Sequence, residues 1–222
     1  MSGAPLVLLG AGGLAREVMA MLPTLGRTVV AVLDDDPRLH GQQFGSATVS
    51  GGMDAVVDFP DAELLACVGS GPGRRAVATR MAAQGVGDDR WATVVHPSVG
   101  EQSALRLGPG CILLQGVVAT ADVRVGSHVV MMPNVVLTHD CLVESFATLC
   151  AGVCLGGAVR IGANAYLGMN ASVRQGVQVG ANSVLGMGGV LLSDLPAGQT
   201  WVGVPATRLR ETTSTTAERA AS

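Results

Sequence analysis

From Leu137 to Val179 the chain reads LTHDCLVESFATLCAGVCLGGAVRIGANAYLGMNASVRQGVQV. An aliphatic residue returns at every sixth position of this stretch, and the same frame runs without a slip from Leu107 to Leu191. Fourteen of the fifteen residues in that frame are Leu, Ile, Val or Met, and Ala119 is the exception. The fourth residue after each frame position is small or β-branched. The residue directly after a frame position is often Gly, as a turn between short strands requires.

A period of six residues fits neither an α-helix of 3.6 residues per turn nor one long strand. It fits a parallel β-helix, in which three short strands make one triangular coil of eighteen residues. Fifteen hexads then form about five coils, stacked at the ~4.8 Å strand spacing. The composition agrees, because only 3% of the 222 residues are aromatic while 48% are hydrophobic. A core of Val, Leu, Ala and Gly suits a narrow, regular interior.

Charge and composition exclude several classes of function. All 14 basic residues are Arg, so Schiff-base lysines, the Walker-type phosphate lysine and class A β-lactamase chemistry are ruled out. A net charge of −3, scattered Arg and few rings argue against nucleic-acid binding. No apolar run approaches the ~20 residues of a membrane span, so a cytoplasmic protein with no membrane partner is expected. The five cysteines (Cys67, Cys111, Cys141, Cys150 and Cys154) lack CxxC spacing and are interpreted as buried thiols in a reducing compartment.

The first ninety residues carry a different pattern, in which a strand, a glycine cluster, a helix and a second strand follow one another. Glycines in this layout let a phosphate approach a helix N-terminus, and an acid after the second strand meets a ribose. We interpret residues 1–92 as a Rossmann-like half-domain that grips a mononucleotide, with a purely structural glycine turn as the alternative. A complete dinucleotide site is disfavoured, because Ala15 replaces the third glycine. The expected elements are strands 5–9, 28–33 and 64–68, helices 14–22 and 74–84, the turn Gly10–Gly13 and the acids Asp34–Asp36.

The order of the segments is itself specific. A glycine-turn domain, the connector Val95-His96-Pro97-Ser98, a hexapeptide β-helix and the closing Gly203-Val204-Pro205-Ala206 together resemble the sugar O/N-acyltransferase family. The resemblance covers residues 5–209. It implies a left-handed β-helix over residues 93–209, acetyl-CoA as co-substrate, a homotrimer, and acetylation of nucleotide-linked amino sugars or sialic acids. Residues 210–222 are expected to form a disordered tail.

Among the four histidines, His139 is the candidate for catalysis. His40 is expected in a solvated loop, His96 in packing at the domain junction, and His128 exposed at a corner of the β-helix. His139 is the third residue of its hexad and should point outwards, with Asp140 directly after it. The segment Thr138-His139-Asp140-Cys141 resembles the family's His-acid-Cys segment. The resemblance makes His139 the general base and Asp140 the group that orients its ring.

Coil arithmetic adds an argument of its own. Gly157 follows His139 by eighteen residues and should therefore stack beside it, with its N–H free to hold a thioester carbonyl. Relief of crowding at a corner is the alternative role for this glycine. By resemblance, CoA lies between neighbouring β-helices and contacts Thr148, Gly157, Met169 and Met187. Met169 and Met187 are eighteen residues apart, so they should stack on successive coils as an apolar rail for the pantetheine arm of CoA. Alternatively, they are ordinary surface methionines.

The acceptor is less defined. By layout and resemblance, Gly12, Gly13, Leu14, Asp34 and Asp35 bind it. Three departures from the family pattern leave its identity open: Thr148 replaces a second His, Met132 replaces an Asn and Leu14 replaces a His.

We predict an N- or O-acyltransferase acting by direct transfer on a sugar. The alternatives are transfer to a non-sugar amine or alcohol of secondary metabolism, and a non-catalytic nucleotide-binding scaffold. A zinc enzyme of the β-helix carbonic anhydrase type needs three converging histidines. His128 and His139 differ by eleven, which does not stack them, so no metal is expected.

Overall fold

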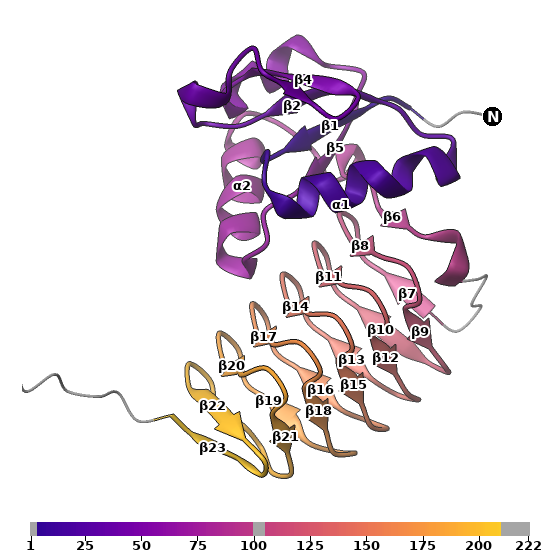
Figure 1. Cartoon of the computed structure of the whole chain (residues 1–222), viewed down its shortest axis with the longest axis vertical. Coiled ribbons are helices and arrows are strands. Elements are labelled where there is room, and N and C mark those ends of the chain that lie inside the picture. Colours follow the sequence, from indigo (N-terminus) through magenta and orange to yellow (C-terminus); the bar gives the residue numbers. More distant parts are fainter. Residues whose placement is uncertain (1–3, 100–104, 210–222) are drawn as a thin grey trace, which may run out of the picture.

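The computed structural model describes residues 4–99 and 105–209. Figure 1 shows an α/β part lying across one end of a long ladder of short strands. The expected disordered tail, residues 210–222, lies outside the described residues.

The α/β part contains a five-stranded sheet in the order β3-β4-β2-β1-β5. The central strand β1 pairs in parallel with both β2 and β5, and β2 pairs in parallel with β4. Only β3 is antiparallel to its neighbour. The strands and helices agree with the sequence expectation except for β3 and β4, which the sequence did not indicate. Their bounds are β1 Leu6–Leu9, α1 Gly13–Met21, β2 Val29–Leu33, β3 Gln43–Phe44, β4 Ala47–Gly51, β5 Glu63–Ala66 and α2 Gly71–Ala83.

Side chains of β1 alternate between two hydrophobic clusters, as period-two geometry requires. Leu6 and Leu8 pack with α1 and with the outer surface of the first β-helix coils. Val7 and Leu9 pack on the opposite face with Val77 of α2. The helix α1 is therefore held between the sheet and the β-helix, as Figure 1 shows.

The ladder is a parallel β-helix with eighteen residues per coil. Val130, for example, pairs with Ile112 in the coil before it and with Thr148 in the coil after it. The hexad frame from Leu113 to Leu191 points inwards and is buried, and Leu107 at its start is half-buried. The predicted coil and frame are thus confirmed. The strands are β6 Val94–Val95, β7 Leu105–Leu107, β8 Ile112–Leu113, β9 Val118–Ala119, β10 Val123–Val125, β11 Val130–Met131, β12 Val136–Leu137, β13 Leu142–Val143, β14 Thr148–Leu149, β15 Cys154–Leu155, β16 Arg160–Ile161, β17 Tyr166–Leu167, β18 Ser172–Val173, β19 Gln178–Val179, β20 Val184–Leu185, β21 Val190–Leu191, β22 Thr200–Gly203 and β23 Ala206–Arg208.

Three sheets form the sides of the prism. The covered sheet (β6, β8, β11, β14, β17, β20, β22, β23) faces the α/β part at its first strands. The valine sheet (β9, β12, β15, β18, β21) presents mainly small or β-branched side chains outwards. The arginine sheet (β7, β10, β13, β16, β19) presents three arginines, one leucine and one glutamine outwards. Those outward residues are Val118, Val136, Cys154, Ser172 and Val190 on the valine sheet, and Arg106, Arg124, Leu142, Arg160 and Gln178 on the arginine sheet.

Three edges separate these sheets. The covered edge (residues 126–129, 144–147 and 162–165) lies between the arginine and covered sheets. The methionine edge (132–135, 150–153, 168–171 and 186–189) lies between the covered and valine sheets. The histidine edge (120–122, 138–141, 156–159 and 174–177) lies between the valine and arginine sheets. At each edge the backbone turns through a residue of positive φ, such as Asp140 at 60° and Asn134 at 61°.

The cysteines depart from expectation in one place. Cys67, Cys111, Cys141 and Cys150 are buried free thiols, but Cys154 is exposed. Its side chain falls on the outward side of β15, because the inward position of that strand belongs to Leu155.

Candidate active site

The histidine edge places a histidine and an acid side by side. His139 Nδ1 lies 2.7 Å from Asp140 Oδ2, and the two side chains are 65% and 61% exposed. With Nδ1–H donated to the carboxylate, the lone pair of the imidazole is on Nε2. The pair therefore presents a proton acceptor at the surface of the prism.

Gly157 lies directly against this imidazole. A Cβ added at Gly157 would fall 2.4 Å from His139 Nε2, so any other residue would displace the ring from this position. The Gly157 carbonyl accepts from Gly176 N at 2.8 Å, while the Gly157 N–H has no partner among the described residues. The stacking predicted from the eighteen-residue spacing is confirmed. It leaves one backbone donor free next to the base.

Met169 and Met187 are placed at a different edge. They stack on successive coils of the methionine edge, where Gly188 N donates to Met169 O at 2.8 Å. Their side chains are 49% and 72% exposed. The valine sheet separates them from His139, so one chain alone does not bring the rail and the base together.

The expectation that Thr148 contacts CoA is contradicted. Thr148 is 4% exposed and lies under the α/β part. Its hydroxyl donates to Gly69 O at 3.2 Å and accepts from Arg74 Nη2 at 2.9 Å. Because both hydrogen-bonding roles are satisfied within the chain, this hydroxyl is not available to a ligand.

Arg74, which sequence reasoning missed, joins the two parts of the molecule. It is completely buried, and its guanidinium donates to carbonyls on both sides of the junction at 2.9–3.0 Å. Burial lowers the pKa of Arg74 to about 10, so the side chain stays charged at neutral pH. The sequence of α2 contains three arginines, and nothing in it distinguishes Arg74 as the buried one. Its acceptors are Val68 O, Gly69 O, His128 O, Phe146 O and Ala147 O, with Thr148 Oγ1.

The expected exposure of His128 is also wrong. The side chain is 4% exposed, stacks on Phe146 at 5.0 Å between centroids and meets Trp91 edge-on at 4.6 Å. Burial, with a smaller contribution from the nearby charge of Arg74, lowers the pKa of His128 to about 4. The ring is therefore a neutral packing element of the covered edge.

The remaining histidines lie in surface loops. His40 is exposed, with Nε2 2.8 Å from Asp34 O, and His96 Nδ1 is 2.8 Å from Ser98 Oγ at the junction. Neither is near His139 along the coils.

The glycine turn is open, but its neighbours are not all free for a ligand. Gly12 and Gly13 have no atom within 4 Å of an added Cβ, so space exists over the start of α1. Asp34 accepts from Ala11 N at 2.8 Å and from Asp36 N at 2.9 Å, which uses both carboxylate oxygens to fix the turn. Asp34 therefore has a structural role in the turn, and its contact with a ribose stays a prediction.

Asp35 and Leu14 are engaged in different ways. Asp35 accepts from Met53 N at 3.0 Å and pairs with Arg80 at 2.6 Å, yet its side chain is 54% exposed. Leu14 is 7% exposed and belongs to one hydrophobic cluster with Met132 and Val130. The Leu14 side chain is therefore not free to contact the acceptor, and a contact through its backbone in the first turn of α1 stays a prediction. Two departures from the family pattern, Leu14 and Met132, meet in this cluster.

The comparisons with known proteins agree with this architecture. Residues 158–193 match the family model of the hexapeptide repeat of succinyl-transferase. The crystal structure of PerB from Caulobacter crescentus with CoA and GDP-perosamine is 30% identical, with a TM-score of 0.84 over 93% of this chain and 97% of that one. The chain belongs to the hexapeptide-repeat sugar acyltransferases. Its β-helix is accordingly of the left-handed type.

Further relatives support the assignment to these acyltransferases. A variant of perosamine N-acetyltransferase from C. crescentus, in complex with CoA and GDP-perosamine, is 28% identical, with a TM-score of 0.86 over 93% of this chain and 97% of that one. The acetyltransferase domain of PglB from Neisseria gonorrhoeae, in complex with acetyl coenzyme A, is 27% identical, with a TM-score of 0.84 over 93% and 100%. No match to a curated protein was found.

Two further observations concern metal-binding groups and membrane-spanning helices. Across residues 4–99 and 105–209, no group of three or more His, Cys, Asp or Glu side chains is arranged to hold a metal ion. None of the helices in that part of the chain is long and apolar enough to cross a membrane.

Proposed function

We propose that the protein transfers an acetyl group from acetyl-CoA to the amine of a nucleotide-linked amino sugar. The observation that carries the proposal is the His139–Asp140 pair stacked on Gly157, which puts a proton acceptor and a free N–H side by side. Relatives that share the fold over nearly the whole chain are described with CoA or acetyl-CoA, and two of them with GDP-perosamine.

In this mechanism the nitrogen of the acceptor amine attacks the thioester carbonyl, and His139 Nε2 removes a proton from that nitrogen. An imidazole can both accept and return a proton, which suits it to that exchange. The new C–N bond forms, the C–S bond breaks, and the proton held by the imidazole is available to the departing CoA thiolate. Asp140 fixes the ring through Nδ1 and stabilises its protonated form.

The Gly157 N–H supplies the second element. A backbone donor next to the base is placed to bind the oxygen that becomes negative when the amine adds. Because the donor is part of the β-helix backbone, it is already oriented before the substrates bind.

We further propose a homotrimer with active sites between subunits. The outward residues of the valine sheet include Val118, which is 42% exposed, and four further positions that are apolar or small. Three such sheets packed around a threefold axis would bury these side chains. Threefold symmetry then sets the histidine edge of one subunit against the methionine edge of the next. In that arrangement Met169 and Met187 of the partner subunit line the groove that leads to His139, as a pantetheine arm requires.

The α/β part is proposed as a Rossmann-like acceptor domain of residues 1–92, preceding a transferase domain of residues 93–209. Its first parallel strand leads into an open glycine turn and a helix N-terminus, which together suit a phosphate. Asp35, with its side chain 54% exposed after β2, is the acid proposed to contact the acceptor. Because Leu14 and Met132 replace a His and an Asn of the family pattern, these polar contacts to the acceptor are missing, and the sugar itself is expected to differ from that of the relatives.

The test measures acetyl-CoA-dependent thiol release with a panel of nucleotide-linked amino sugars, the matching hydroxyl sugars, and amines and alcohols that are not sugars. We expect release with at least one amino sugar and none with the His139→Ala protein. Turnover confined to non-sugar acceptors would replace the proposed acceptor class. Absence of turnover with every acceptor would reject the enzyme in favour of a nucleotide-binding scaffold.

A further inference from the structure

A hollow of about 330 Å³ opens on the arginine sheet next to the histidine edge. Arg124 of β10 and Arg160 of β16 line it from either side, and Leu142 of β13 lies between them in the same register. Asp140 lines the same hollow. The hollow therefore adjoins the pair proposed to perform the chemistry.

The side chains of the two arginines have no partner among the residues that the structure describes. Neither Arg124 nor Arg160 makes an ion pair or side-chain hydrogen bond with any residue in 4–99 or 105–209, although Asp122 and Asp140 line the same hollow. Arg106 of β7 pairs with Arg124 in the register, which stacks like charges on adjacent strands. Such pairs destabilise a sheet. A bound anion would relieve this repulsion.

The lining carries both signs of charge in a fixed order. The carboxylates of Asp122 and Asp140 come from the histidine edge, and the guanidinium groups lie farther onto the sheet. A ligand that complements the hollow has a cationic end towards His139 and an anionic end towards Arg124 and Arg160. An amino sugar joined to a diphosphate has this order of charges.

The distances along the coils distinguish two sources of phosphate. Arg124 and Arg160 each lie one strand from Leu142, so both are within about 5 Å of the Asp140 coil along the prism axis. In a nucleotide sugar one sugar ring separates the reacting amine from the diphosphate. In CoA the whole pantetheine arm separates the thioester from the phosphates. The position of the arginines matches the first ligand.

We propose that Arg124 and Arg160 bind the diphosphate of the acceptor and so select nucleotide-linked amino sugars over free ones. This inference rests on the proposed acetyl transfer. In the proposed trimer, the arginine sheet of one subunit borders the same cleft as the covered sheet and α/β part of the next. The acceptor would thus have its nucleotide in one subunit and its diphosphate on the arginines of another.

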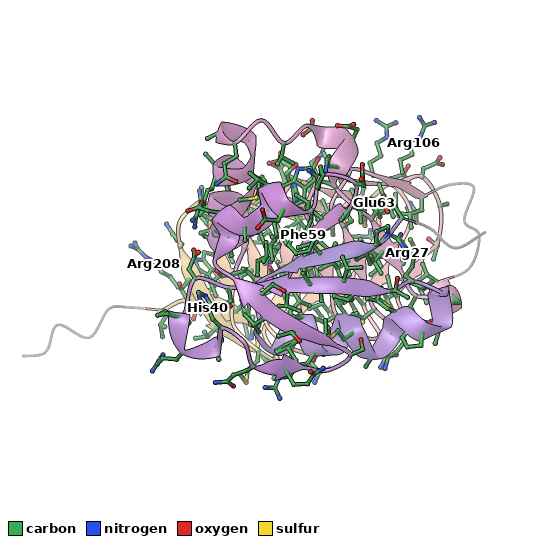
Figure 2. The ribbon with its side chains drawn as sticks, turned by 90° about the horizontal axis from the view of Figure 1, so that it is seen from above. Arg27, His40, Phe59, Glu63, Arg106 and Arg208 are labelled. Atoms are coloured by element: carbon green, nitrogen blue, oxygen red, sulfur yellow. The ribbon has the colours of Figure 1, made fainter. Side chains whose placement is uncertain are left out.

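The test compares Arg124→Gln, Arg160→Gln and the matched control Arg106→Gln. Arg106 belongs to the same column but does not line the hollow, and Figure 2 shows its side chain directed away from the body of the protein. Each hollow variant should raise the acceptor KM roughly tenfold or more, since a charge-assisted hydrogen bond is lost. The KM for acetyl-CoA should stay within about twofold, and Arg106→Gln should match the wild type in both. With an amino sugar that lacks the diphosphate, all four proteins should behave alike.

Three results would overturn the inference while leaving acetyl transfer in place. They are an unchanged acceptor KM, a rise in the KM for acetyl-CoA instead, and an equal effect of Arg106→Gln. If the wild type shows no turnover at all, the proposed function fails, and calorimetry with inorganic pyrophosphate tests the hollow separately. Pyrophosphate binding that Arg124→Gln weakens and Arg106→Gln does not would support the site. Equal binding by all proteins would reject it.

Discussion

The β-helix contains two histidines that face opposite surroundings. His128 is the fourth residue of its hexad, and His139 is the third residue of another. His128 lies at the covered edge, 4% exposed between Phe146 and Trp91, and its pKa is lowered to about 4. His139 lies at the histidine edge with its side chain 65% exposed and an acid as its partner. The repeat sets the direction of each side chain, but the α/β part decides which edge meets solvent. In this fold the chemistry of an outward residue therefore depends on what is docked over its edge.

The largest effect is expected when the exposed imidazole of His139 is removed. His139→Ala should lower kcat by ~10²–10⁴, the range expected when a positioned proton transfer is lost. Because the ring packs on Gly157 outside the prism, the free energy of unfolding should hardly change. Steady-state kinetics and thermal denaturation measure the two effects, and His96→Ala, in a loop away from the edge, is the control. A folded His139→Ala protein that keeps more than about a tenth of the wild-type kcat would exclude His139 as the base.

The next largest effect is expected at the covered edge, from Arg74→Met. The methionine retains much of the side-chain volume but leaves buried carbonyls without their donor, which should cost roughly 3–5 kcal/mol of unfolding free energy. Denaturant unfolding followed by circular dichroism measures the loss. Arg75→Met is the control: Arg75 is exposed and its guanidinium lies 5.2 Å from the centre of the Phe146 ring, so losing this contact should cost no more than about 1 kcal/mol. Equal effects of the two substitutions would show that Arg74 does not hold the two parts together.

A smaller effect concerns the titration of His128. The unfolded chain takes up a proton at this residue near pH 6.5, whereas the folded protein does so only near pH 4. The contribution of His128 to the free energy of unfolding is therefore fully present above pH 6.5. It falls by an amount on the order of 2–3 kcal/mol as the pH drops towards 4.

The matched protein for that titration is His128→Asn, since Asn tolerates the positive φ of 56° and does not titrate in this range. The variant should be less stable at pH 7, because it loses ring packing, but its stability should change less between pH 7 and pH 5. Melting temperatures at the two pH values give both slopes. Parallel slopes would mean that His128 is not the group responsible.

The smallest effect is expected for Asp140→Asn. The amide still reaches His139 Nδ1 but cannot stabilise the protonated ring as a carboxylate does, so kcat should fall about tenfold. A loss as large as that of His139→Ala would indicate that Asp140 contacts substrate directly. The comparison is made at saturating acetyl-CoA, with KM for both substrates determined in parallel.

How much of this arrangement the sequence contains depends on the range of the interactions involved. The coils, their inward frame and the stacking of Gly157 on His139 follow from one spacing, because each coil repeats the last. The column of Arg106, Arg124 and Arg160 obeys the same multiples of eighteen, so coil arithmetic could have found it.

Residues whose surroundings come from the other part of the chain escaped prediction. His128 is buried by Trp91 and the Arg74 segment, and Thr148 is covered by Gly69 and Arg74. These contacts join residues more than thirty positions apart, where no period applies. For Asp34 the sequence left out a structural role, because an acid after the second strand can fix the glycine turn as well as meet a ribose.

The left-handed backbone at Asp140 bears on how such a protein evolves. With φ at 60°, this corner is a conformation that Gly and Asn adopt more readily than most residues, and Asn occupies it at 134, 164, 170 and 182. Drift from Asp to Asn at 140 would therefore meet little resistance from the backbone while it weakens the base. Under the proposed mechanism, selection for acetyl transfer would favour the acid at this corner. A chain released from that selection could lose part of its activity by this one substitution while its β-helix stays intact.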